Sequence, residues 1–243
     1  MLNDAMNLYL SSNYEEAINY LHEIIRLSPE LPEPYHHLSL IYEKKGELTK
    51  ALDFLMLSAQ LSHGESEIWI RCAYLNKKLN NTQQAEYCIT RALKIEKDNP
   101  YLLYERAVLQ EEMGNIKKAA NLYERILKII PSNSDILIYV SNLFLKLKNN
   151  DKAIEILEKN YEKSNKKYVV LVVLFNLYLT NDKYYEGIVF YERMFINQND
   201  DDIIPPIDLK LRYLFFRLLQ NEKNLVENQE FNNDNFEIVI IIV

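Results

Sequence analysis

Apolar and polar residues follow one another along this chain with the spacing of amphipathic helices, and the pattern returns after 34 residues. The segment at 13–29, NYEEAINYLHEIIRLSP, and the segment at 115–131, NIKKAANLYERILKIIP, place their apolar residues in nearly the same order, although 102 residues, three times 34, separate them. Apolar residues at steps of three and four predict helices that each bury one face. A fixed period of this length predicts a tandem repeat of helical units.

One small residue per repeat marks the register. Starting at Ala17, a small residue recurs every 34 positions in six copies, without an insertion or deletion. A large apolar or aromatic residue lies four positions after each of these small residues. A second column lies twelve positions earlier and is small in all copies but the last. The two columns are Ala17, Ala51, Ala85, Ala119, Ala153 and Gly187, and Ala5, Ser39, Ala73, Ala107, Ser141 and Phe175.

This period, with small residues at two fixed offsets, resembles the tetratricopeptide (TPR) repeat, a pair of antiparallel helices packed closely enough to require small side chains between them. The resemblance predicts an all-α fold, a right-handed superhelical solenoid of about six TPRs over residues 1–200. Taken alone, KYVVLVVLF at 167–175 has the β-branched content of a strand. The register outweighs this propensity and predicts the first helix of the sixth repeat at 168–180.

Residues 201–243 do not continue the period. PPIDLKLRYLFFRLLQ offers Pro206 at a helix start, followed by a wide apolar face, and predicts a C-terminal helix that caps the array. A polar stretch and the apolar FEIVIIIV follow, and an end of this kind predicts a truncated gene product. The predicted capping face consists of Leu209, Leu211, Leu214, Phe215, Leu218 and Leu219.

Composition and motifs narrow the classes of function. The 35 acidic residues exceed the 28 Lys and Arg, for a net charge of -7, which argues against direct nucleic-acid binding. No apolar run is long enough to predict a membrane span. Cys72 and Cys88 predict two buried thiols. His22 and Glu23 lack the second zinc-binding histidine, since Arg26 stands in its place. We therefore expect no metal, no cofactor and no enzyme activity.

Stacked TPR hairpins present their first helices on a concave groove, and this groove is the predicted binding site. Its first-helix positions are rich in aromatic residues and poor in charge, which suits a helical or extended peptide with apolar anchors. The alternative is that several of these tyrosines pack between neighbouring repeats. The residues do not reproduce the dicarboxylate clamp of chaperone adaptors. The predicted groove residues are His37, Arg71, Tyr74, Tyr104, Glu105, Tyr139 and Asn142.

Residues outside the repeat columns carry a second resemblance. The stretch at 23–131, with SAQLSHGESEIWIRCA, QAEYCITRALK and YLLYERAVLQEEMGN in this order, is similar to the TPR subunit of general transcription factor IIIC (TFIIIC), and IPPIDLKLRYLFFRLL resembles the segment that ends the family's first TPR array. The resemblance covers the first array only. It implies a nuclear protein that receives subunits of TFIIIB for RNA polymerase III, contacts other TFIIIC subunits and leaves DNA contacts largely to them.

Two other functions fit the residues. The chain could be a general TPR adaptor that binds a peptide segment in the cytoplasm. It could also be the TPR recruiting arm of a larger enzyme. Localisation and the sequence of the full transcript distinguish these alternatives from the nuclear role.

Overall fold

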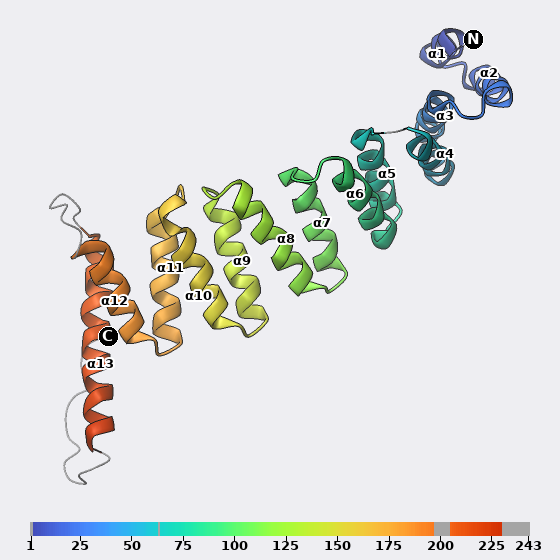
Figure 1. The fold of residues 1–243 in the computed structure, drawn as a ribbon. Coiled ribbons are helices and arrows are strands. Elements are labelled where there is room, and N and C mark those ends of the chain that lie inside the picture. Colours follow the sequence, from blue (N-terminus) through green and yellow to red (C-terminus); the bar gives the residue numbers. More distant parts are fainter. Residues whose placement is uncertain (1, 63, 197–204, 230–243) are drawn as a thin grey trace. The chain divides into compact units, whose positions relative to one another are not determined.

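The structure is a computed structural model that describes residues 2–62, 64–196 and 205–229, with side chains described up to residue 224. Its regular elements in these ranges are all helices, which confirms the predicted all-α fold (Figure 1). The chain forms two compact units, residues 1–131 and 132–243. The first unit contains α1 (Leu2–Leu10), α2 (Tyr14–Leu27), α3 (Pro32–Lys44), α4 (Leu48–Leu61), α5 (Ser66–Lys78), α6 (Thr82–Ile95), α7 (Pro100–Glu112) and α8 (Ile116–Ile129). The second contains α9 (Ser134–Lys146), α10 (Asn150–Asn160), the short 3₁₀ helix η1 (Tyr161–Lys163), α11 (Lys167–Thr180), α12 (Tyr184–Phe195) and α13 (Ile207–Gln229).

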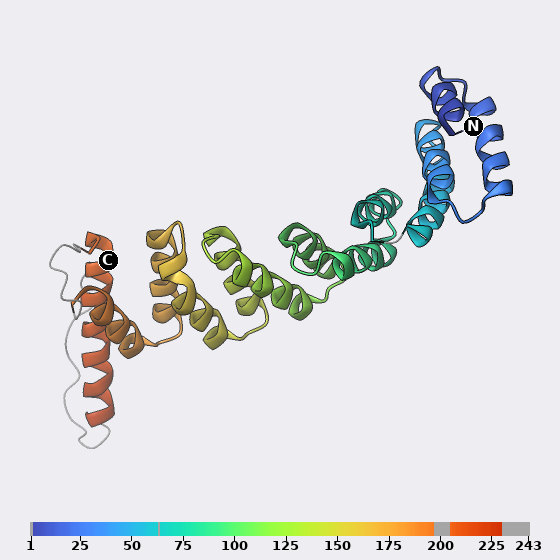
Figure 2. The ribbon, with the colours of Figure 1, turned by 45° about the horizontal axis from the view of Figure 1, so that its top comes forward.

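Consecutive helices pair as hairpins within each unit. In the first unit, each odd-numbered helix packs against the helix that follows it, and α2, α4 and α6 pack against the first helix of the next hairpin (Figure 2). The same order recurs in the second unit from α9 to α13. Helix α11 spans Lys167–Thr180, so the register predicted this segment correctly where local propensity suggested a strand.

The two small columns lie at the centres of these hairpins. The five alanines of the first column, from Ala17 to Ala153, have no exposed surface, and all members of the second column are at most 2% exposed. Small side chains let the two helices approach closely, so the large residues four positions later can fill the space beside them. The two cysteines, Cys72 and Cys88, are buried and unbridged, as the sequence predicted.

Every hairpin turn contains one residue with positive φ, at positions 34 apart. Gly46 and Gly114 adopt φ of 79° and 77°, and non-glycine residues take the same left-handed conformation at the other four turns. The amide of the next residue donates to the carbonyl five positions back, as in Asn115 N to Gln110 O at 2.8 Å, which satisfies a carbonyl at the helix end. The non-glycine members are Ser12, Asn80, Lys148 and Asp182.

The last hairpin departs from the others at both columns. Phe175 replaces the small residue of α11, and its buried ring stacks on Phe216 of α13 with centroids 5.7 Å apart. Gly187 replaces the alanine of α12, and a Cβ atom there would lie 2.6 Å from the Phe216 ring. The glycine therefore makes room for the aromatic ring that α13 supplies.

Helix α13 packs through a different face from the predicted one. Leu209, Tyr213 and Phe216 are buried among the side chains of α13 that the structure describes, and the Tyr213 ring stacks on that of Tyr191 in α12 with centroids 4.4 Å apart. Of the predicted face, only Leu209 is buried and Leu219 is partly buried. The prediction was wrong for Leu211, Leu214, Phe215 and Leu218, which are 46–62% exposed. The physical reason is that a helix with apolar residues on two sides is oriented by its best-fitting ring, and Phe216 fits over Gly187.

Residues 197–204 and 230–243, which include FEIVIIIV, lie outside the described residues. None of the described helices has the length and apolar character needed to cross a membrane.

Candidate partner-binding surface

Five of the seven predicted groove residues lie on three successive first helices of the first unit. His37 lies on α3, Arg71 and Tyr74 on α5, and Tyr104 and Glu105 on α7. Tyr74 and Tyr104 are 52% and 45% exposed, although the opposite sides of their helices are buried in the hairpins. We call the surface formed by these five residues, together with His36, Glu43, Lys77, Lys78 and Tyr101, the first-unit face.

Arg71 links α5 to α3 on the first-unit face. Its Nη2 donates to Glu43 Oε2 at 3.1 Å, and its Nη1 lies 3.3 Å from His36 Nε2. A guanidinium can only donate, so this nitrogen of His36 accepts and the imidazole is neutral in the contact. The two contacts hold the Arg71 guanidinium in place while its side chain stays about one-third exposed.

Both histidines of α3 favour the neutral form. Burial, and then the positive charge of Arg71, lower the pKa of His36 below its ordinary value. Burial likewise lowers the pKa of His37, although Glu33 acts in the opposite direction. The Nδ1 atom of His37 is buried and has no hydrogen-bond partner among the residues that the structure describes. The pair is therefore a neutral, half-buried element at one end of the first-unit face.

A second polar bridge joins α5 to α7. Lys77 Nζ donates to Glu105 Oε2 at 2.9 Å, and this hydrogen bond raises the pKa of Lys77. The neighbouring Lys78 places its ammonium 4.5 Å from the centre of the Tyr74 ring. The cation covers part of the ring and favours one orientation of this exposed aromatic side chain.

Tyr104 is partly held by the interior of its own hairpin. Its ring makes an edge contact with the buried Tyr123 of α8, with centroids 5.9 Å apart. The Tyr123 hydroxyl donates to Glu111 Oε1 at 2.8 Å. Tyr104 thus combines internal packing with a 45% exposed ring, and Tyr101, on the same helix, is 57% exposed.

The remaining two predicted residues belong to the second unit. Tyr139 and Asn142 both lie on α9, three residues apart and therefore on one side of the helix, and both are exposed. The two bridges link the three helices that carry the other five residues, whereas these two lie on α9.

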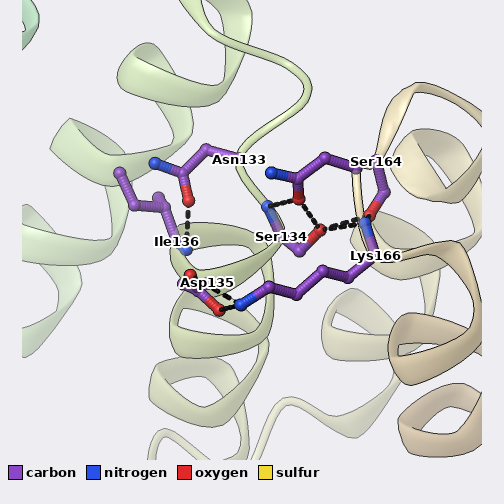
Figure 3. Close-up of polar contacts among 7 residues, drawn as sticks. Asn133, Ser134, Asp135, Ile136, Ser164 and Lys166 are labelled. Atoms are coloured by element: carbon purple, nitrogen blue, oxygen red, sulfur yellow. Dashed lines mark hydrogen bonds and ion pairs between the residues drawn. The ribbon is translucent and has the colours of Figure 1, made fainter.

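A polar cluster fixes the start of α9 against the start of α11 (Figure 3). The Asn133 side chain accepts from Ile136 N at 3.1 Å, and Lys166 Nζ donates to Asp135 Oδ1 at 2.9 Å. The amide of Lys166 donates to Ser134 Oγ at 2.9 Å. Asp135 is therefore paired with Lys166 and helps to hold the two helix starts together.

The predicted groove residues did not include Glu43 and Lys77, whose carboxylate and ammonium groups complete the two bridges. A signal for them exists in the sequence, because Arg71 follows Glu43 by 28 residues and Glu105 follows Lys77 by 28. In both pairs, a charge near the end of one first helix reaches an opposite charge in the middle of the next first helix. His36 can be found only from the structure, since its acceptor role depends on the position of the Arg71 side chain.

The first-unit face suits recognition of a protein segment. It offers exposed aromatic rings with restricted orientations and a fixed guanidinium, which are side chains enriched at the centres of protein interfaces. The described part of the chain contains no group of three or more His, Cys, Asp or Glu residues that could hold a metal ion.

Comparison with known families identifies the repeat. Models of the tetratricopeptide repeat match residues 32–62 and 110–159. The chain therefore contains TPRs, as the 34-residue register predicted, and TPRs are a protein-interaction architecture.

Two similar proteins are transcription factor subunits. Human "General transcription factor 3C polypeptide 3" is 37% identical over 109 residues, which are 45% of this chain and 12% of that protein. The "Transcription factor tau subunit sfc4" of Schizosaccharomyces pombe is 30% identical over 104 residues, 41% of this chain and 10% of that protein. The matched region thus spans about a tenth of each relative.

A solved structure of similar fold covers nearly the whole chain. In the structure of Naa15/Naa10 bound to HypK-THB, one chain matches 96% of this chain with a TM-score of 0.59 and 14% sequence identity, over 37% of its own length. At this identity the likeness shows the fold alone.

Proposed function

We propose that this chain is a non-enzymatic scaffold of RNA polymerase III initiation, related to the TPR subunit of TFIIIC, and that it helps to assemble TFIIIB. The observation that carries the proposal is the 37% identity over 109 residues with the human transcription factor subunit. The TPRs form a fold used for protein interaction, and the first-unit face provides the side chains that contact the partner.

The first-unit face binds a peptide segment of the partner through its aromatic side chains. The Tyr74 and Tyr104 rings bury apolar anchors, and Arg71 donates to a carbonyl or carboxylate of the segment. Lys78 and Tyr123 already restrict the two rings, so less side-chain entropy is lost on binding. In the second unit, Tyr139 and Asn142 of α9 supply a further pair of contact residues.

The partners follow from the relationship. TFIIIB subunits occupy the first-unit face, and other TFIIIC subunits contact the remaining surface in the nucleus. With 35 acidic against 28 basic residues, the chain contributes no electrostatic attraction to DNA, so DNA contacts belong to the other subunits.

A reciprocal binding experiment tests the proposal. Tagged wild-type chain is incubated with nuclear extract and the bound proteins are identified by mass spectrometry. TFIIIB subunits that are recovered are then produced in pure form and titrated against the chain. We expect direct binding, and we expect Arg71→Glu with Tyr104→Ala to weaken it by at least about tenfold, the loss of two central contacts.

The matched control makes the same two kinds of substitution elsewhere in the first unit. Tyr20 and Arg26 lie on α2, where Tyr20 is 38% exposed and Arg26 pairs only locally with Glu23. Tyr20→Ala with Arg26→Glu should leave binding unchanged. Equal effects of the two double variants, with unchanged circular dichroism, would sink the assignment of the first-unit face.

The same experiment separates the alternatives. Recovery of cytoplasmic proteins without TFIIIB or TFIIIC subunits would make the chain a general TPR adaptor. A transcript that continues from this sequence into a catalytic domain would make it the recruiting arm of an enzyme.

A further inference from the structure

The apolar residues of α13 that face solvent form one continuous stripe. Ile207 is 79% exposed, and the next four members, at steps of four, three, one and three residues, are 46–62% exposed. At 100° per residue these positions lie on one side of the helix over about 16 Å. We call this surface the α13 stripe; its residues are Ile207, Leu211, Leu214, Phe215 and Leu218.

The helix itself is anchored through its other side. Leu209 and Phe216 are at most 1% exposed, and the Tyr213 hydroxyl donates to Glu192 Oε1 at 2.8 Å. The α13 stripe is therefore presented on a fixed helix and has no covering element among the described residues. A contiguous exposed apolar face of this kind is characteristic of an interaction site.

The charges beside the stripe are basic on one edge. Lys210 and Arg217 lie there, both exposed, and neither forms an ion pair with any carboxylate that the structure describes. The Arg217 guanidinium lies 5.8 Å from the centre of the Tyr213 ring. On the opposite edge, Asp208 accepts from the Tyr168 hydroxyl at 2.7 Å, and Arg212 donates to Asn176. The basic edge of the stripe thus carries two exposed positive charges in a chain whose net charge is -7, with the exposed Glu222 one turn beyond Leu218.

We propose that the α13 stripe binds an acidic amphipathic helix of a partner protein. Apolar residues at steps of three and four on that helix fill the stripe, and its Asp or Glu residues pair with Lys210 and Arg217. This site is separate from the first-unit face and belongs to the other unit of the chain.

Other occupants fit the charges less well. In an antiparallel pair of copies of this chain, the two basic edges would lie side by side and repel. In a parallel pair, each basic edge would meet the edge that carries both Asp208 and Arg212, whose charges offset each other. An anionic lipid surface would attract the basic edge but repel a chain of net charge -7. An acidic helix is the occupant that gains from both the apolar stripe and its basic edge.

The test uses synthetic helical peptides of about 18 residues, which form about five turns. The acidic peptide has leucines at i, i+4, i+7 and i+11 with flanking glutamates. A second peptide has lysines in place of the glutamates, and a third has the acidic composition in scrambled order. Binding of each labelled peptide to the full chain is measured by fluorescence anisotropy.

Two double variants identify the site. Leu211→Lys with Leu218→Lys should weaken binding of the acidic peptide by at least about tenfold. Lys210→Glu with Arg217→Glu should weaken the acidic peptide by a similar factor and make the lysine peptide the tighter ligand. Leu10→Lys with Leu57→Lys, at leucines that are 72% and 43% exposed in the first unit, is the matched control and should change nothing.

Four results would overturn the proposal. These are equal binding of the scrambled peptide, absence of acidic-peptide binding, stripe-dependent binding to phosphatidylserine vesicles without peptide binding, and stripe-dependent dimerisation in analytical ultracentrifugation. A chain shortened to residues 1–229 adds a fifth, because binding that appears only after this deletion would make residues 230–243 the occupant. Persistence of TFIIIB binding in the Leu211 and Leu218 variant would show that the first-unit face functions independently.

Discussion

The two units use the same repeat but differ in how their first helices are joined. In the first unit, polar side chains cross between them, as Arg71 does to Glu43 and Lys77 to Glu105. In the second unit, polar contacts such as Lys166 to Asp135 and Tyr168 to Asp208 also join these helices, and the buried Phe175 ring in addition stacks on Phe216. The buried columns are thus compatible with two kinds of surface, one of paired charges and tyrosines and the other apolar.

This difference separates the two proposed binding surfaces. Charge pairs on a partly exposed face contribute little to stability but fix the side chains that meet a partner. Buried aromatic rings contribute much more to stability and fix the orientation of a whole helix. The proposed site of the first unit therefore uses individually held side chains, whereas that of the second unit uses a complete apolar helix face.

Removal of the central ring of α13 should give the largest effect. Phe216 is 1% exposed, so Phe216→Ala should lower the free energy of unfolding of the second unit by about 3–5 kcal/mol, the cost of a large cavity in a core. Hydrogen exchange resolved by peptide measures this in each unit separately, since a chain with two units need not unfold in one step.

The adjacent Phe215 provides the control. It is 46% exposed, and Phe215→Ala should cost less than about 1 kcal/mol because little buried contact is lost. The first unit should keep its protection in both variants. Comparable losses from the two substitutions would show that α13 packs through the apolar stripe after all.

Substitutions at the left-handed turn position should change the free energy of unfolding by an intermediate amount, with opposite sign in the two units. Lys148 adopts φ of 56°, so Lys148→Gly should stabilise the second unit by about 0.5–1 kcal/mol, while Gly114→Ala should destabilise the first unit by a similar amount. Urea unfolding of each variant, followed by unit-resolved hydrogen exchange, measures both changes. A destabilising Lys148→Gly would contradict the left-handed assignment.

A change in pH should give the smallest effect, and only in the first unit. All four histidines lie in that unit, and burial lowers the pKa of His36 and His37 below about 6.5. Below pH 6.5 the unfolded chain binds protons that the folded unit does not, so stability decreases as the pH falls through this range. Thermal unfolding between pH 7.5 and pH 5.5 measures the decrease, with both values chosen as about one unit on either side of 6.5.

The control for the pH effect is His36→Gln with His37→Gln, which removes both titrating groups. This variant should lose the part of the pH dependence that belongs to the first unit, and the second unit should show none from histidine in either protein. An unchanged pH dependence in the variant would assign the effect to other groups.

Periodic features of the fold could be predicted from the sequence. A 34-residue register places small residues, hairpin turns and helix α11 correctly, even though the β-branched residues of α11 favour a strand locally. Repetition makes this possible, because a small residue recurs at the same position in six copies and chance agreement over six copies is improbable. The exposure of Tyr74 and Tyr104 follows from the same register, whereas the role of the first-unit face in binding remains a proposal.

Side-chain partners between repeats could be predicted only in part. The 28-residue spacing of Glu43 and Arg71 is present in the sequence, but the contact of Arg71 with His36 depends on a rotamer and on neutral imidazole. Such contacts are formed by side chains from helices that touch only after the hairpins stack.

The sequence by itself determined the repeat, its register and its closely packed helix pairs, because these depend on residue size and local periodicity. Only the tertiary structure decided which side of α13 is buried, since that helix has apolar residues on two sides and hydrophobicity cannot choose between them. The choice depends on shape: Gly187 leaves space for the Phe216 ring, which stacks on Phe175, and this orientation turns Leu211 and Leu218 outward.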